Sequence, residues 1–158
     1  MSEVKPVPEG FNTLSAHIVV RNALEAMEFY AKAFGARRTR RMVIPGTDAT
    51  LHAEMQIGTS TLMLVDEMPE FGLKSPEALG DRHCTLHLFV DDADAAYRQA
   101  LEAGCRESMP IHDAFWGDRY GKVIDPFGYE WAIATHKEEL SEAEWNERAK
   151  EFFGGLLG

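Results

Sequence analysis

The nine-residue stretches LSAHIVVRN at 14–22 and CTLHLFVDD at 84–92 decide the fold, because they carry one pattern in two halves of the chain. In the first stretch, apolar residues such as Ile18 and Val20 recur at every second position, which predicts a β-strand. His17 alternates with them and is expected on the opposite face of that strand. Asn22 is a typical N-cap residue and predicts a helix from Ala23.

The second stretch follows the first at an offset of 70 residues, and residues outside the two stretches match at the same offset. The matched pairs are His17 and His87, Val20 and Val90, Asn22 and Asp92, Ala26 and Ala96, Asp48 and Asp118, and Gly58 and Gly128. A single match would carry no weight. Six matches at one offset indicate an internal duplication.

Both halves show the same order of predicted elements, a strand, a helix and three more strands. The predicted strands are 14–20, 37–44, 50–57 and 61–66, then 84–90, 105–109, 116–124 and 129–135, with helices at 23–34 and 93–103. We therefore expect an α+β fold in which two tandem βαβββ modules, 11–67 and 83–137, flank a linker at 68–82 within one domain. One face of each sheet is left uncovered by its helix, so the two sheets are expected to form a curved cup.

A further helix is predicted at 139–153, because Ser141 and Glu144 have the spacing of a capping box. Trp145, Phe152 and Phe153 lie roughly on one stripe of this helix. An isolated helix of this length is marginal in water, so it must dock on its own chain or on a partner. We expect a homodimer, in which the partner completes or covers the cup.

Composition excludes several classes of function. The 158 residues carry a net charge of −10, with 45% hydrophobic and 27% charged residues, as in ordinary globular proteins. Such a charge repels nucleic acid, and the one basic cluster, within 37–41, is interpreted as a solvated strand edge. No apolar run is long enough for a membrane span, and no signal peptide is recognisable. Cys84 and Cys105 are expected to be reduced thiols in a cytoplasmic protein.

Several motifs resemble the vicinal oxygen chelate superfamily, which includes glyoxalase I, extradiol dioxygenases and the fosfomycin- and bleomycin-resistance proteins. They are the duplicated βαβββ order, Ala26-x-x-Phe29-Tyr30 in the first helix, and Asp125-Pro126-Phe127-Gly128 before the last strand. The stretches 115–121 and 131–136 and the tail look like its PhnB-like branch. The resemblance covers residues 11–137 and implies a small-molecule site in the cup, but one such cup hosts many chemistries.

Catalytic members of this superfamily hold a divalent metal in the cup, and the resemblance indicates which positions would supply its ligands. In this chain those positions hold Ser15, Leu62, Thr85 and Ala132. None of the four is a good ligand for zinc, nickel or iron. The usual glyoxalase metal site is therefore not expected.

An alternative set of ligands lies two residues away, at His17, His87 and Glu130. Because the period of a strand is two, all three are still expected to point into the cup. Two histidines and one carboxylate can bind one Zn, Ni, Mn or Fe ion with positions left open for substrate. The alternative interpretation is that the histidines are polar residues that line the cavity and bind ligand or water.

Other residues are candidates for binding or proton transfer. His52 and Glu54 are expected to line the same cup, and Glu54 and Glu130 are the candidate catalytic carboxylates. Trp116, Arg119 and Tyr120 are suited to stacking on a flat or charged ligand, although Arg119 can instead form a salt bridge with Asp118 or a neighbour. Trp131 is expected in the core, and His83, His112 and His136 are expected to be solvated.

Two functions remain open at this point. In the first, a dry aromatic cup binds a small organic molecule without turnover. In the second, the protein is a metal-dependent lyase, isomerase or dioxygenase-like enzyme, in which the metal stabilises an enolate or a similar anion. The empty ligand positions favour the first.

Overall fold

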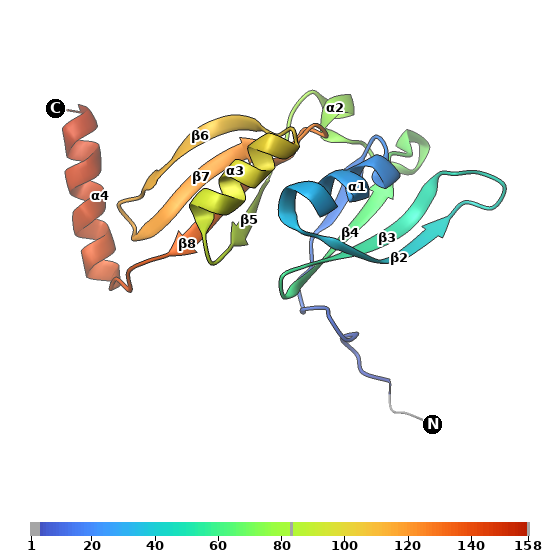
Figure 1. The fold of residues 1–158 in the computed structure, drawn as a ribbon, viewed down its shortest axis with the longest axis horizontal. Helices are drawn as coiled ribbons and strands as arrows, with labels where there is room; N and C mark the ends of the chain where they lie inside the picture. Colours follow the sequence, from blue (N-terminus) through green and yellow to red (C-terminus); the bar gives the residue numbers. More distant parts are fainter. Residues whose placement is uncertain (1–3, 83, 158) are drawn as a thin grey trace. The chain divides into compact units, whose positions relative to one another are not determined.

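The computed structural model describes residues 4–82 and 84–157 (Figure 1). The chain forms two compact units, Met1–His83 and Cys84–Gly158, which we call the first and second modules. Each module is built around one four-stranded sheet and has one long helix between its first two strands. The second module also carries the C-terminal helix.

In the first module the strands lie side by side in the order β1-β4-β3-β2. β1 runs parallel to β4, whereas β3 runs antiparallel to both of its neighbours. The elements of this module are β1 (His17–Val20), α1 (Ala23–Phe34), β2 (Arg37–Val43), β3 (Thr50–Ile57), β4 (Ser60–Asp66), η1 (Pro69–Phe71) and α2 (Pro76–Leu79).

The second module repeats this arrangement in the order β5-β8-β7-β6, with β5 parallel to β8 and the other pairs antiparallel. Its elements are β5 (Thr85–Phe89), α3 (Ala93–Ala103), β6 (Arg106–Asp113), β7 (Asp118–Ile124), β8 (Glu130–His136) and α4 (Glu142–Leu157). The predicted α+β fold, two βαβββ modules and a C-terminal helix, is confirmed.

The matched residues Asn22 and Asp92 cap the two equivalent helices. The Asn22 side chain accepts a hydrogen bond from the backbone N–H of Glu25 at 3.1 Å, and Asp92 accepts one from Ala95 at 3.0 Å. Each cap satisfies an N–H of the first helical turn that has no partner within the helix. Both copies of the duplicated pattern therefore have an N-cap residue at the start of the helix.

Trp131 is one of the largest buried side chains and belongs to the core of the second module, as its alternation predicts. Its side chain is 2% exposed, and its indole N–H donates to Asp125 at 2.8 Å. The ring of Tyr97 lies close against Gly121 of β7, and a Cβ on that glycine would stand only 3.0 Å from it. A larger residue there would force α3 away from the sheet.

Two strands differ from their predicted bounds by more than two residues. The first begins at His17 rather than at 14, because its pairing with β4 begins at His17 and Met63. Leu14 lies before the strand and is 89% exposed. β6 continues to Asp113 rather than ending at 109, because it pairs with β7 as far as Arg119.

The segment predicted as a linker, 68–82, holds the short helices η1 and α2. Arg21, beside the start of α1, donates to Glu77 of α2 at 2.8 Å. The hydroxyl of Ser75 donates to Glu67 at 2.7 Å. These contacts tie the segment to the first module.

α4 begins at Glu142, within the predicted capping box and three residues after the predicted start at 139. The Ser141 hydroxyl accepts from the N–H of Glu144 at 3.3 Å, and the Glu144 carboxylate accepts from the N–H of Ser141 at 2.8 Å. The helix continues four residues beyond the predicted end at 153. The glycines at 154–155 weaken a helix but keep the backbone N–H groups that its ladder requires.

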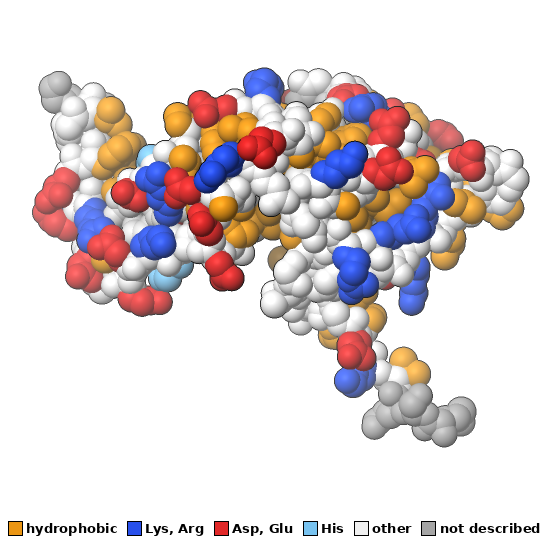
Figure 2. Space-filling view, viewed as in Figure 1, with side chains coloured by type: hydrophobic (Ala, Val, Ile, Leu, Met, Phe, Trp, Pro, Cys, Tyr) orange, Lys and Arg blue, Asp and Glu red, His pale blue; other side chains and the backbone are white. Residues whose placement is uncertain are grey.

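Charges of both signs are mixed on the face shown in Figure 2. The basic cluster of 37–41 lies on β2, at the edge of the first sheet, and most of its side chains are exposed. Among the described residues, no helix has the length and apolar character that crossing a bilayer requires.

Candidate functional site

Strand alternation in the first module separates two sets of side chains. Ile18 and Ala53 are buried toward α1. His17, His52 and Glu54 alternate with them and lie on what we call the far face, the face of a sheet opposite its own helix α1 or α3. These predicted site residues therefore share one face of one sheet.

Three of these side chains form a cluster with Arg40 of β2. His52 Nε2 lies 3.1 Å from Glu54 Oε1, and Arg40 Nε lies 3.9 Å from Glu54 Oε2. The rings of His17 and His52 are 6.3 Å apart between centroids. Partial desolvation, together with the nearby His52, lowers the pKa of His17. His17 is thus kept neutral at neutral pH.

The pair formed by His52 and Glu54 is chemically suited to proton transfer. A carboxylate only accepts hydrogen bonds, so a neutral His52 in this contact carries its proton on Nε2. That tautomer leaves the lone pair on Nδ1, where the ring can accept a proton. A histidine in this arrangement can act as a general base, but the pair alone does not define a reaction.

In the second module the same alternation applies. Trp131 and Ile133 face α3, so Glu130, Ala132 and Ala134 of β8 lie on the far face. The neighbouring strands then fix the rest of this face by register. On the far face, β8 is flanked by His87 and Phe89 of β5 and by Tyr120 and Lys122 of β7.

Five aromatic rings meet on this far face around Tyr120, and we call them the aromatic face. The ring of Tyr120 has its centroid 4.9 Å from Trp116, 5.9 Å from His87 and 6.0 Å from His112. His87 in turn lies 4.5 Å from Phe89. The predicted residues His87, Trp116 and Tyr120 are therefore brought together, and Phe89 and His112 join them.

Short side chains lie beneath these rings. Ala132 and Ala134 are almost completely buried and form a small apolar cluster with Tyr120 and Ala114. Trp116 packs against this cluster, whereas Phe89 remains 68% exposed. The aromatic face is thus supported from below and accessible at one side.

The charge state of His87 suits an apolar surface. Partial desolvation lowers the pKa of His87, and Lys122 lowers it further, although Asp118 acts in the opposite direction. The imidazole is therefore neutral at neutral pH. A neutral ring can stack on a flat apolar molecule without a charge having to be desolvated.

Glu130 is held by three donors of its own module. It accepts hydrogen bonds from Thr85 at 2.9 Å, from Ser108 at 2.7 Å and from the Lys122 ammonium at 3.1 Å. Burial of the carboxyl raises its pKa, but the bonds from Ser108, Thr85 and Lys122 together outweigh this and lower the pKa of Glu130 to about 2. Both oxygens are occupied, and such a weak base is poorly suited to take up a proton.

The predicted metal ligands belong to both modules, His17 to the first and His87 and Glu130 to the second, so their grouping around one ion stays a prediction. Within either module, no three or more described His, Cys, Asp or Glu side chains are grouped so that they could hold a metal. Thr85, at a ligand position of the resemblance, donates to Glu130 instead. The Lys122 ammonium beside Glu130 would also repel a second cation at that carboxylate. Within the second module, Glu130 is therefore engaged by donors of its own module.

Two histidines that look solitary in the sequence have defined partners. His112 of β6 lies directly across from Tyr120 in the β6–β7 ladder. His136 Nδ1 lies 2.8 Å from the buried Asp118, whose other oxygen accepts the indole N–H of Trp116 at 3.0 Å. Only the antiparallel register reveals these contacts. His136 is exposed, as expected, and His112 is half-buried, whereas His83 lies outside the described residues.

Arg119 does not belong to the aromatic face. It follows Asp118 and precedes Tyr120, and alternation turns it toward α3. There Arg119 forms two hydrogen bonds with Asp94 at 2.9 and 3.0 Å and one with Asp113 at 3.3 Å. The alternative interpretation, a salt bridge, is correct in kind, with Asp94 rather than Asp118 as the main partner.

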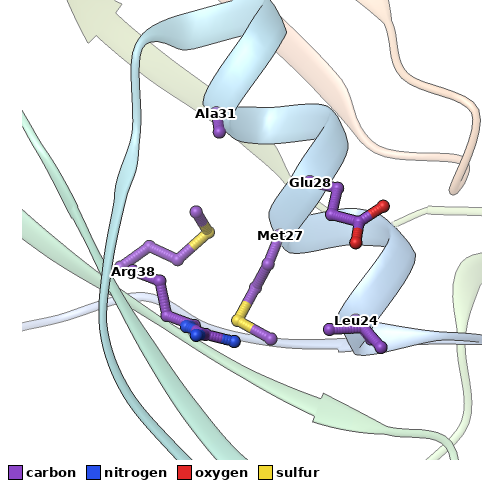
Figure 3. Close-up of a pocket in the computed structure, with 6 residues that line it drawn as sticks. Leu24, Met27, Glu28, Ala31 and Arg38 are labelled. Carbon is purple, nitrogen blue, oxygen red and sulfur yellow. The ribbon is translucent and has the colours of Figure 1, made fainter.

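A separate shallow pocket of about 300 Å³ lies in the first module, between α1 and the sheet (Figure 3). The residues that line it are Leu24, Met27, Glu28, Ala31, Arg38 and Met55. Met27 and Met55 form its buried apolar part, whereas Glu28 and Arg38 are exposed. None of the predicted site residues lines it, so it is not part of the predicted site.

Comparison with known proteins identifies the family. The model of the Glyoxalase/Bleomycin resistance protein/Dioxygenase superfamily matches residues 11–133. The chain belongs to this superfamily. The match spans both modules as far as β8, so the aromatic face and the cluster of the first module both lie within the matched residues.

One curated relative is similar to this chain over most of its length, and two solved structures have a similar fold. The Mycobacterium bovis protein Mb0911c is 43% identical over 135 residues, which cover 83% of this chain and 88% of that protein. The structure of the At5g48480 product from Arabidopsis thaliana has a TM-score of 0.62 at 26% identity and covers 78% of this chain and 98% of that one. TioX from Micromonospora sp. ML1 has a TM-score of 0.65 at 22% identity, with coverages of 79% and 98%, which shows the fold.

Glu130 should make a measurable contribution to stability between about pH 4.5 and 2. Its pKa is depressed in the folded protein, so the stabilisation is fully present above the ordinary value of 4.5 and is lost as the pH falls toward about 2. Glu130→Gln should remove this contribution, at most about 3 kcal/mol, as measured by urea unfolding across this pH range.

The matched control is Glu70→Gln, an exposed carboxylate in η1. It should keep the pH dependence of the wild type. An unchanged pH dependence in Glu130→Gln would contradict the assignment of Glu130 as a hydrogen-bonded structural anion.

Proposed function

We propose that this member of the glyoxalase/bleomycin-resistance superfamily binds a flat, largely apolar organic molecule on the aromatic face of the second module, without a metal. The observation that carries the proposal is the convergence of His87, Phe89, Trp116 and Tyr120 on one far face above buried alanines. Aromatic rings present large, rigid contact areas that gain free energy when they stack.

The charges around the aromatic face support an uncharged ligand. Asp118 is paired with Trp116 and His136, and Glu130 with Lys122, Ser108 and Thr85, so both carboxylates already have their partners. A ligand on the aromatic face therefore contacts mainly the faces of the aromatic rings. This favours binding over turnover, because proton transfer in this module would need a carboxylate that Glu130, with a pKa of about 2, does not provide.

Within the superfamily we assign the chain to the PhnB-like branch. The support is the sequence of the turn and strand at 115–121 and of β8 at 131–136, the segments that carry Trp116 and Tyr120. The assignment concerns the branch and leaves the ligand open. It predicts a small-molecule partner rather than a nucleic acid or a membrane.

The probe N-phenyl-1-naphthylamine, which is uncharged, aromatic and fluorescent, tests the proposal. The wild type should bind it saturably at one site. Trp116→Ala should weaken binding about tenfold, equivalent to about 1.4 kcal/mol, because one wall of the stack is lost. Fluorescence titration gives both dissociation constants.

Phe71→Ala is the matched control, since Phe71 is an aromatic residue of the first module that is 76% exposed. It should bind the probe like the wild type. Equal affinities for the wild type and Trp116→Ala would refute the proposed site, whether or not the probe binds elsewhere.

We also propose that the chain forms a homodimer through α4. The support is that Trp145, Phe152, Phe153 and Leu156 of this helix remain 47–65% exposed, and hydrophobic side chains are visible on it in Figure 2. Light scattering at micromolar concentration should give twice the 17.7 kDa of one chain. Leu156→Glu should lower this mass, and a wild-type mass of 17.7 kDa would exclude the dimer.

We infer a cytoplasmic location. Its support is that Cys84, which is exposed, and Cys105, which is buried, are both free thiols. Burial, reinforced by Asp125, raises the pKa of the Cys105 thiol to about 12, so this sulfur is protonated and unreactive.

A further inference from the structure

The turn between β6 and β7 contacts both α4 and the aromatic face, through two neighbouring residues. Phe115 and Trp116 are neighbours in this turn, with their rings perpendicular and 5.1 Å apart. Trp116 packs onto Tyr120 of the aromatic face. Phe115 instead packs against two rings of α4, Phe152 at 5.1 Å and Phe153 at 6.2 Å.

Polar contacts hold α4 to the backbone of the same turn. The indole N–H of Trp145 donates to the carbonyl of Trp116 at 3.2 Å, and Arg148 donates to the carbonyl of Phe115 at 3.4 Å. Arg148 is itself fixed by two bonds to Glu138, at 2.7 and 3.1 Å. α4 therefore contacts both residues of the turn, one through its ring and both through their carbonyls.

Gly117 closes the turn against the segment that leads into α4. Its φ is +98°, which L side chains rarely adopt, and a Cβ would lie 2.9 Å from the carbonyl oxygen of Glu138. The carbonyl of Gly117 accepts from the N–H groups of Lys137 and Glu138, at 3.0 and 3.1 Å. The backbone of the turn is thus fixed by residues 137–138 before α4 begins.

A second route joins Trp116 to the same segment through side chains. The indole of Trp116 donates to Asp118, and Asp118 contacts His136, whose Nε2 lies 3.2 Å from Glu139. Hydrogen bonds to Asp118 and Glu139, despite partial desolvation, raise the pKa of His136. Both routes from Trp116 therefore lead to 137–139, just before α4.

We infer that α4 positions Trp116, so that the affinity of the aromatic face for its ligand depends on the docking of the C-terminal helix. This inference rests on the proposed function. Phe115, Trp145 and Phe152 are positioning residues, since they act through Trp116: Phe115 and Trp145 contact it directly, and Phe152 packs on Phe115. Release of the helix removes the bonds from Trp145 and Arg148 to the carbonyls of the turn and the packing of Phe152 on Phe115, which loosens the orientation of Trp116 above Tyr120.

The experiment uses the full chain labelled with 5-fluorotryptophan. The three tryptophans of the chain then give separate ¹⁹F resonances. The test variants are Trp145→Phe, which removes the indole N–H and keeps a smaller aromatic ring, and the double variant Trp145→Phe with Phe152→Ala. Both should shift or broaden the resonance of Trp116. The resonance of Trp131, buried between α3 and the sheet, should not change and shows that the module stays folded.

The same proteins are titrated with N-phenyl-1-naphthylamine. We expect a threefold to tenfold weaker affinity in the double variant, with a smaller effect in Trp145→Phe. Leu156→Glu is the matched control, because it charges an exposed position of the same helix that has no contact with the turn among those described above. It should keep the wild-type affinity and the Trp116 resonance, even where it changes the oligomeric state.

The outcomes separate the two proposals. If Trp116→Ala weakens probe binding but the double variant binds like the wild type, the role of α4 is overturned and the proposed function stands. If Trp116→Ala has no effect on binding, the proposed function fails. An unchanged Trp116 resonance in the double variant overturns the positioning role on its own, independently of any ligand.

Discussion

The constraint on which this structure depends is that each module has a four-stranded sheet and a single long helix packed along it. Because side chains alternate along a strand, the helix collects one set of residues and leaves the other set on the far face. In the second module the first set includes Trp131 and Arg119, and the second includes His87, Tyr120 and Glu130. Residues two positions apart on a strand therefore lie on the same face, whereas adjacent residues such as Arg119 and Tyr120 lie on opposite faces.

Hydrogen bonding then decides what chemistry the far face of the second module offers. Two carboxylates lie there, and each is buried and occupied, Asp118 by Trp116 and His136 and Glu130 by three donors. For Glu130 these bonds lower the pKa to about 2, so this carboxylate is a poor base. What remains for a ligand is a set of ring faces above small residues. The first module differs, since His52 and Glu54 there keep a proton-transfer geometry.

The sequence predicted the fold and the far faces well, because both follow from local periods and from the 70-residue duplication. It failed where a contact depends on register between strands. His136 and Asp118 lie 18 residues apart and meet only through the β7–β8 ladder. Glu130 was a candidate metal ligand on the basis of parity, yet Ser108 reaches it from β6 next to a register shift that no periodicity reveals. Arg119 and Tyr120 are adjacent in β7, so alternation places them on opposite faces, but only the packing of α3 shows that Asp94 is the partner of Arg119.

The most direct test is to locate a bound aromatic molecule by nuclear Overhauser effects. The uniformly labelled protein with N-phenyl-1-naphthylamine should show contacts from the naphthyl protons to the rings of His87, Trp116 and Tyr120. Contacts instead to the methyl groups of Met27 and Met55, in the pocket beneath α1, would contradict the account, because they would show that the ligand site lies on the helix-covered side of the first module.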